Sequence, residues 1–141
     1  MKLAKFAMLV AAVGVLGACG SRTHRITEVD VHTTPRVFFA FDRYDISEEA
    51  RANLQGQALF MNNNPGVRIT IEGHADERGT REYNLALGAR RANAARNVLI
   101  AEGVEANRIR TVSYGKDRPW KLGTGEAVWR YNRNATTVVR R

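Results

Sequence analysis

Residues 67–103 of this 141-residue chain read VRITIEGHADERGTREYNLALGARRANAARNVLIAEG, and this stretch decides the fold. Residues 67–72 alternate apolar with polar side chains, which predicts a half-buried strand. Residues 80–102 carry apolar side chains at helical spacing and are followed by Gly103, which predicts a long helix. The loop at residues 73–80 joins a strand end to a helix start, where backbone N–H groups lack partners within the helix.

Two further elements are predicted upstream of this stretch. The apolar run at residues 37–41 has the length of a strand and suits burial on both faces. An apolar stripe then predicts a helix over about residues 46–62, which the Asn-Pro-Gly turn at residues 62–66 ends. Asp45 and Glu48 have the spacing of a capping box, so we expect Asp45 to cap this helix.

Three elements are predicted downstream. Residues 109–114 and 135–140 have the character of strands, and residues 123–132 suit a glycine-rich turn with a short helix. The order strand-helix-strand-helix-strand-strand predicts a single α+β domain over residues 37–141, in which helices pack on one mixed sheet.

The first residues have the pattern of a secretory signal. A basic start is followed by the apolar run 6–16 and by small residues up to Cys19, so cleavage is expected before Cys19. The apolar run is about half of the roughly 20 residues that a spanning helix needs. The sequence LGAC at residues 16–19 resembles the lipobox of bacterial lipoproteins, which implies acylation of Cys19. The alternative is an ordinary secreted protein with one free thiol.

The signal pattern divides the chain into a signal peptide at residues 1–18, a lipidated cysteine with a polar tether at residues 19–36, and the folded domain. His24 and His32 lie in the tether and are expected to be solvated. The chain holds 22 basic and 14 acidic residues, a net charge of +8, but export argues against nucleic acid as the partner. Phosphorylated lipid headgroups and a carboxylate-bearing wall polymer remain as anionic partners. A single cysteine excludes an intrachain disulfide.

The long helix contains two polar residues on its apolar side. Asn84 and Arg91 are seven residues apart and fall within the apolar arc, together with Gly88, whose missing side chain would let a neighbouring element pack closely. A guanidinium on the core side costs several kcal/mol unless a carboxylate and hydrogen-bond acceptors meet it. Arg91 therefore needs an anionic partner. Asp76 could satisfy it permanently, or the side chain could extend outward at the helix edge.

The loop before the helix suggests a binding role for this pair. Asp76 lies at the same rim as the first turns of the helix, where free N–H groups favour an anionic ligand atom. An acid and a base a short distance apart suit a zwitterionic ligand, because Asp76 could bind its ammonium and Arg91 its carboxylate. A free amino acid centre carries both groups on one carbon.

Three motifs carry a resemblance to a known family. IEGHADERGT at residues 71–80, YNLALGARRAN at residues 83–93 and VSYG at residues 112–115 resemble the OmpA-like peptidoglycan-binding domain, and the likeness extends over about residues 37–140. The resemblance implies a lipoprotein on the periplasmic face of a Gram-negative outer membrane. Such a protein binds the diaminopimelate of peptidoglycan stem peptides non-covalently. It also implies partnership with TolB and other Tol proteins in envelope integrity and cell division.

The resemblance also assigns roles to residues. The diaminopimelate-binding aspartate of the family falls on Asp76, its carboxylate-binding arginine on Arg91, and a polar pocket residue on Asp42. Asn134 stands where the family usually has a second arginine after Arg133. The remaining candidates are two residues of the pocket wall and helix support and four adjacent residues: Asn84 and Leu87, then His74, Ala75, Thr80 and Tyr83.

Two other classes of function compete with this interpretation. An enzyme could use the His-Ala-Asp-Glu run at residues 74–77 as metal ligands or acid–base groups, but the run lacks the distant third ligand of a hydrolytic metal site. We therefore expect no enzyme, no metal and no cofactor. A protein-binding adaptor could dock a partner through the basic surface and through Trp120, Trp129 and Tyr131.

Overall fold

The computed structural model of the chain describes residues 35–140. The predictions for residues 1–34, which include the signal peptide and Cys19, lie outside the described residues. The elements follow the predicted order and confirm an α+β fold: β1 (Arg36–Phe38), α1 (Glu48–Asn63), β2 (Arg68–His74), α2 (Arg81–Ala101), a 3₁₀ turn (Ala106–Arg108), β3 (Ile109–Gly115), α3 (Glu126–Asn132) and β4 (Asn134–Arg140). Within the described part of the chain, the search for a helix apolar and long enough to span a bilayer finds none.

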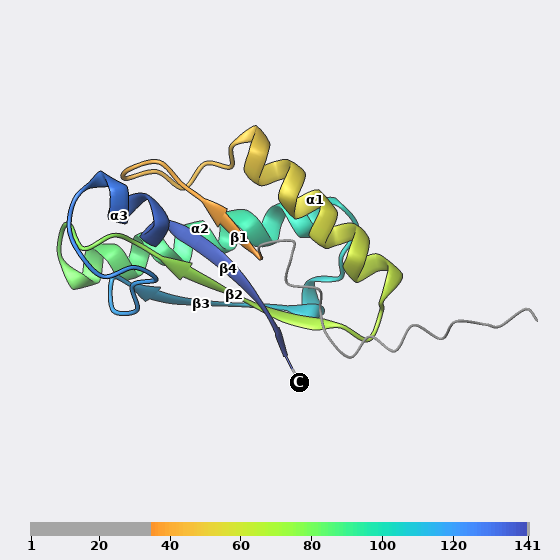
Figure 1. Cartoon of the computed structure of the whole chain (residues 1–141). Helices are drawn as coiled ribbons and strands as arrows, with labels where there is room; N and C mark the ends of the chain where they lie inside the picture. Colours follow the sequence, from red (N-terminus) through yellow and green to blue (C-terminus); the bar gives the residue numbers. More distant parts are fainter. Residues whose placement is uncertain (1–34, 141) are drawn as a thin grey trace, which may run out of the picture.

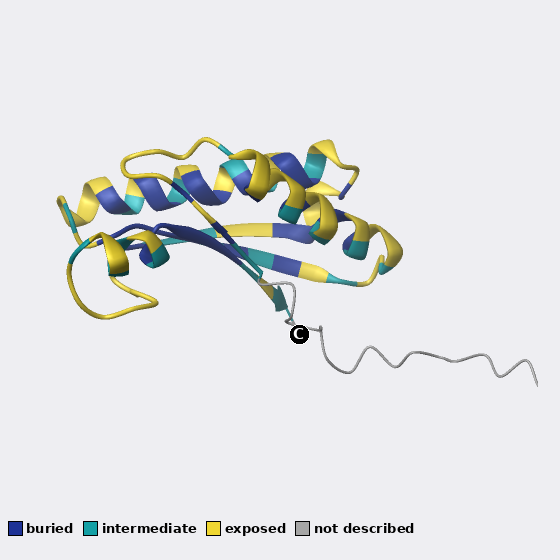
Figure 2. Ribbon diagram, turned by 45° about the horizontal axis from the view of Figure 1, so that its top comes forward, coloured by how far each residue is buried: buried dark blue, intermediate teal, exposed yellow. Residues whose placement is uncertain are grey.

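The four strands form one mixed sheet in the order β1-β4-β2-β3. β2 and β3 are parallel, whereas β4 is antiparallel to both of its neighbours, β1 and β2. Both long helices lie on the same side of this sheet, as Figures 1 and 2 show, and α3 lies at one end of it. Among residues 35–140, no long helix covers the opposite face of the sheet.

The core lies between the sheet and the two long helices. Ile69 and Ile71 alternate with polar residues along β2 and are buried against the helices, as their spacing predicts. The other members of this core come from every strand and both long helices, and include Val37, Leu54, Met61, Ala92, Ala95, Leu99, Ile109 and Ala135.

Helix α2 packs unusually close to β2 and β3. A Cβ atom on Gly88 would lie 2.3 Å from Oγ of Ser113 and 2.9 Å from the carbonyl oxygen of Gly73. A Cβ on Gly73 would lie only 1.8 Å from the carbonyl oxygen of Gly88. The predicted close approach at Gly88 is thus confirmed, and it fixes the first turns of α2 beside the end of β2.

The prediction for the first strand was wrong in its length and burial. β1 has three residues and lies at the edge of the sheet, so only alternate side chains face the core. Val37 and Phe39 are buried, whereas Phe38 is 39% exposed and Phe41 is 56% exposed. The continuous apolar run therefore belongs to an edge strand and the loop after it.

The caps of the helices differ in one place from the prediction. Ser47, not Asp45, caps α1, because its hydroxyl accepts a hydrogen bond from the backbone N–H of Ala50 at 3.1 Å. Asp45 instead accepts from Nε of Arg43 at 2.6 Å. Thr80 caps α2 through its side chain, as the predicted start of that helix requires.

Candidate functional site

The loops after β1 and β2 and the first turns of α2 enclose a cavity of about 210 Å³. Six of the nine predicted binding residues line it: Asp42, Asp76, Tyr83, Asn84, Leu87 and Arg91. Three residues that sequence reasoning did not select line it as well: Phe41, Arg78 and Gly79. Four of the lining side chains are ionisable acids and bases of opposite sign, so the cavity offers both charges to a ligand.

Asp42 enters the cavity through an uncommon backbone conformation. Its φ is +55°, in the left-handed region that Asp tolerates better than most residues. The hydroxyl of Tyr83, at the start of α2, donates a hydrogen bond to the Asp42 carboxylate, and this bond raises the pKa of Tyr83. The contact joins the loop after β1 to α2 across the mouth of the cavity.

Asp76 is 4% exposed and is held by two arginines. Arg78 donates from its backbone N–H and from Nε to Oδ1, at 3.1 and 3.2 Å, and from Nη2 to Oδ2 at 2.7 Å. Nη1 of Arg133 lies 3.4 Å from Oδ2. Burial alone would raise the pKa of Asp76, but the hydrogen bonds from Arg78 outweigh it and hold that pKa below its ordinary value.

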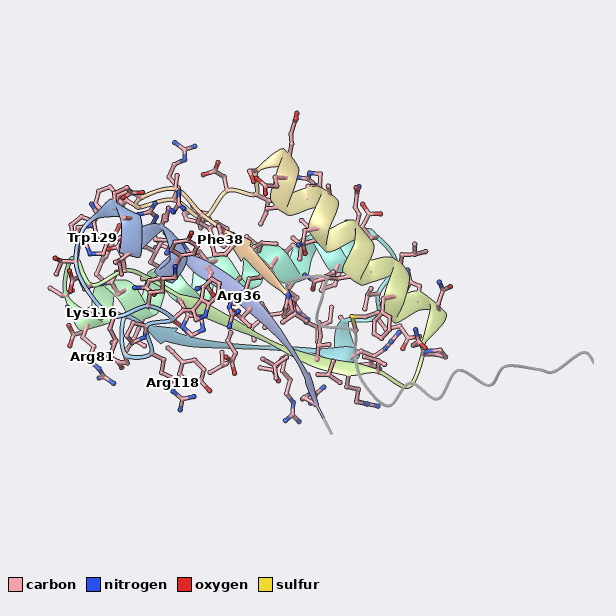
Figure 3. The ribbon with its side chains drawn as sticks, viewed as in Figure 1. Arg36, Phe38, Arg81, Lys116, Arg118 and Trp129 are labelled. Carbon is pink, nitrogen blue, oxygen red and sulfur yellow. The ribbon has the colours of Figure 1, made fainter. Side chains whose placement is uncertain are left out.

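Arg78 is stacked between two aromatic rings while it binds Asp76. Its guanidinium carbon lies 3.7 Å from the ring centroid of Phe41 and 4.0 Å from that of Trp129, an arrangement typical of cation–π contacts. Figure 3 shows Trp129 at the same end of the molecule as Arg81, the first residue of α2. The Arg78 side chain is 31% exposed, so it covers Asp76 from the solvent side.

Arg133 also contacts Asp76, and sequence reasoning did not select it as a site residue. It is buried, and it donates to the Phe39 carbonyl at 2.9 Å and to the carboxylate of Glu126 at 2.5 and 3.0 Å. These bonds anchor the start of β4 to the end of β1. The same guanidinium also donates a hydrogen bond to the Asp76 carboxylate. Its position after α3 gave no signal of a role at Asp76, because Phe39 and Asp76 lie 94 and 57 residues away in the sequence.

Arg91 is fully buried, and its donors bind backbone carbonyls. Nε donates to Arg43 at 2.8 Å, Nη1 to His74 at 2.8 Å and Nη2 to Ala40 at 3.1 Å. No carboxylate of residues 35–140 lies within ion-pair distance of this guanidinium. Neither permanent pairing with an acid nor extension into solvent, the two alternatives raised by the sequence, describes Arg91. Instead the side chain braces the loop after β1 against the end of β2.

Arg91 lines the cavity as a cation that has no ion-pair partner among residues 35–140. Burial lowers its pKa to about 10, and the nearby Asp76 charge opposes this shift, so the side chain stays cationic at neutral pH. A guanidinium has five N–H donors, and three of them are used by the carbonyls, which leaves one on each Nη. A guanidinium with N–H groups to spare binds a carboxylate through charge-assisted hydrogen bonds.

Asn84 and Leu87 form the wall of the cavity on the α2 side. Both are buried, and the Asn84 side chain donates to the Arg78 carbonyl at 2.8 Å. This bond fixes the loop that carries Arg78 against the first turn of α2. The predicted wall position of the two residues therefore agrees with the geometry.

The other three candidates do not line the cavity. His74 follows the strand alternation to the side of Glu72, whose Oε2 lies 3.8 Å from its Nε2, and its ring packs against Tyr114. Ala75 is buried, with its N–H donated to a carbonyl of the neighbouring strand. Thr80 serves as the N-cap of α2. These three residues are close to Asp76 in the sequence, but they do not line the cavity with it.

Asn134 also lies away from the cavity. It is buried at the start of β4, where it donates to the Tyr131 carbonyl and accepts from the Thr136 hydroxyl, both at 2.8 Å.

The three aromatic residues that the sequence suggested for docking a protein partner lie in two places. Trp129 stacks on Arg78, whereas Trp120 and Tyr131 pack on Phe38 at the sheet edge. Within residues 35–140, a search for acidic, histidine and cysteine groups arranged to hold a metal finds none.

The comparison with protein families decides the assignment. The model described as the OmpA family matches residues 38–133, which include the cavity residues on both loops and on α2. The chain belongs to the OmpA family.

Individual relatives that match over most of their own length support membership of the OmpA family. The chain is 48% identical to the "Peptidoglycan-associated lipoprotein" of Rhizobium meliloti, over 88% of this chain and 70% of that protein. It is 39% identical to the protein of the same name from Pasteurella multocida, over 95% and 96% of the two chains. The crystal structure of the peptidoglycan-associated lipoprotein from Burkholderia pseudomallei matches with a TM-score of 0.73 and 43% identity, over 75% and 90% of the chains. These OmpA-family relatives are named for binding rather than for a reaction, and the chain is not an enzyme.

Proposed function

We propose that the cavity binds the zwitterionic end of diaminopimelate in peptidoglycan stem peptides. The observation that carries the proposal is that one cavity is lined both by a buried Arg91, which has no ion pair with any residue from 35 to 140, and by the carboxylate of Asp76. The names of the relatives, which describe association with peptidoglycan, support the same ligand.

The charges of the cavity suggest an orientation for the ligand. Its carboxylate would meet the two remaining N–H groups of Arg91, which lacks an ion pair to any residue from 35 to 140. Its ammonium would lie on the acidic side of the cavity, where Asp42 and Asp76 are found. Since the Arg78 guanidinium already donates hydrogen bonds to the Asp76 carboxylate, the ligand ammonium must compete with it for the same oxygen atoms.

We further propose that this binding tethers the outer membrane to the cell wall. In this proposal Cys19 carries acyl chains, and residues 19–36 connect them to the domain. The sixteen residues 20–35, if extended, reach at most about 50–55 Å, enough for a membrane-anchored domain to meet the wall. The resemblance to the peptidoglycan-associated lipoproteins is what supports partnership with TolB and other Tol proteins in cell division.

Sedimentation with purified peptidoglycan tests the central proposal. The parent chain should pellet with the wall without any other protein, whereas Asp76→Asn should remain largely in the supernatant while its circular dichroism is unchanged. Asp117→Asn is the matched control, because Asp117 pairs with Arg81 outside the cavity. Equal pelleting of the parent and Asp76→Asn would contradict the assignment of the cavity.

The anchoring and the Tol partnership need separate measurements. Cys19→Ser should move the protein from the membrane fraction into the soluble periplasmic fraction, and retention at the membrane would argue against acylation. Purified TolB should bind the domain directly; the absence of any complex at micromolar concentrations would remove this partner from the proposal.

A further inference from the structure

Three arginines gather at one end of the face of the sheet that the long helices leave open. Ile69 and Ile109 point into the core, so Arg68 and Arg110, next to them in β2 and β3, point to the opposite face. Arg140 lies directly opposite Arg68 in the pairing of β4 with β2. We name Arg68, Arg110 and Arg140 the arginine pole.

The pole is a concentration of like charge that serves no evident purpose in the fold. Like charges directly opposite each other on neighbouring strands destabilise a sheet. Burial and the nearby charges of Arg110 and Arg68 all lower the pKa of Arg140. None of the three side chains has an ion pair with a residue in the range 35–140, and Arg68 and Arg110 are exposed. An anionic partner would relieve this repulsion.

The start of β1 lies toward the end of the sheet that carries the pole. β1 runs antiparallel to β4 from Arg36, opposite Thr136, to Phe38, opposite Asn134, and the Thr137 N–H donates to the Pro35 carbonyl at 2.7 Å, so β1 runs away from the Arg140 end of β4. The cavity lies at the other end, since β2 starts at Arg68 and leads to Asp76. Six strand steps separate these ends by about 20 Å. Figure 1 shows the end of β4 and α3 at opposite ends of the sheet.

We propose that the arginine pole binds the anionic phospholipid headgroups of the membrane that holds the N-terminus, an inference that rests on the proposed lipid anchor. Because β1 runs away from the pole and toward the end that holds the cavity, a tether joined to its start would leave the pole facing the membrane and the cavity facing the wall. Exposed Val138 lies beside the pole on the same face and presents an apolar side chain to the interface. The domain is thereby oriented before it meets peptidoglycan.

Vesicle binding tests this inference without the acyl chains. The chain from residue 19 with Cys19→Ser keeps every described residue, and its sedimentation is measured with phosphatidylcholine vesicles with and without phosphatidylglycerol. Each basic residue near an anionic surface contributes about fivefold in binding, so Arg68→Gln/Arg110→Gln should weaken binding to the anionic vesicles by about 25-fold. Arg51→Gln/Arg96→Gln, which removes the same charge from α1 and α2, should have a much smaller effect.

The outcomes separate this inference from the proposed function. Absence of a preference for phosphatidylglycerol, or equal losses in the two double variants, would overturn the inference while leaving the wall binding of the parent intact. Loss of peptidoglycan sedimentation in Arg68→Gln/Arg110→Gln, with vesicle binding unchanged, would identify the pole as a wall contact and would also overturn it. Failure of the proposed function would instead appear as equal wall binding by the parent and Asp76→Asn.

Discussion

Replacement of Arg91 by lysine should destabilise the domain even though the positive charge is kept. The guanidinium spans three carbonyl oxygens that belong to Ala40, Arg43 and His74. An ammonium is a compact single-atom donor and cannot reach all three positions of the planar fork. Each buried carbonyl left without a partner costs about 1–3 kcal/mol, so the loss of two predicts a decrease of about 2–6 kcal/mol in the free energy of unfolding.

This decrease is large compared with the total stability of a domain, about 5–15 kcal/mol. Urea unfolding followed by circular dichroism measures it directly, and Arg96→Lys is the matched control because Arg96 lies on the same helix and makes no side-chain hydrogen bond or ion pair with residues 35–140. Binding of a stem peptide should fall together with stability, since the loop released by the substitution carries Asp42. An Arg91→Lys variant that unfolds at the same urea concentration as the parent would refute the bracing role.

Three further predictions concern packing, pH and the competition at Asp76. Gly88→Ala should destabilise the domain by about 1–3 kcal/mol in urea unfolding, because its Cβ would overlap Ser113 and the Gly73 backbone. Gly56→Ala, which meets nothing within 4 Å, should stabilise α1 by about 0.5–1 kcal/mol, and equal effects of the two would contradict the close packing. The pKa of Asp76 is lower in the folded state, so its contribution to stability is present above its unfolded value of 3.8 and is lost as the pH falls through the folded value. Asp76→Asn should therefore flatten the decline of stability with acid, and an unchanged slope would count against this. Arg78→Gln should tighten binding of a stem peptide by up to about fivefold, because it frees Asp76 for the ammonium, whereas weaker binding would show that Arg78 itself contacts the ligand.

The sequence predicts the elements well because their signals are local. The alternation in β2 and the helical period of α2 both depend on residues within a few positions of one another. The same period placed Asn84 and Arg91 on the buried side of α2, and both are buried.

The errors arise where distant parts of the chain meet. The carbonyl partners of Arg91 lie 17, 48 and 51 residues away, so helical position could show that the guanidinium is buried but not what it binds. The edge position of β1 follows from the order of the sheet, which no single strand reveals. Only His74 could have been excluded earlier, because strand alternation places it on the side of Glu72.

The most direct test of the binding proposal compares two stem peptides that differ at one group. Diaminopimelate carries a carboxylate on its side-chain amino acid centre, and lysine at the same position keeps the amine but lacks that carboxylate. Calorimetric titration should detect binding of the diaminopimelate peptide and at least tenfold weaker binding of the lysine peptide, since a lost charge-assisted bidentate contact is worth roughly 1.5–3 kcal/mol. Equal affinity for the two peptides would contradict the role of Arg91 and, with it, the assignment of the cavity.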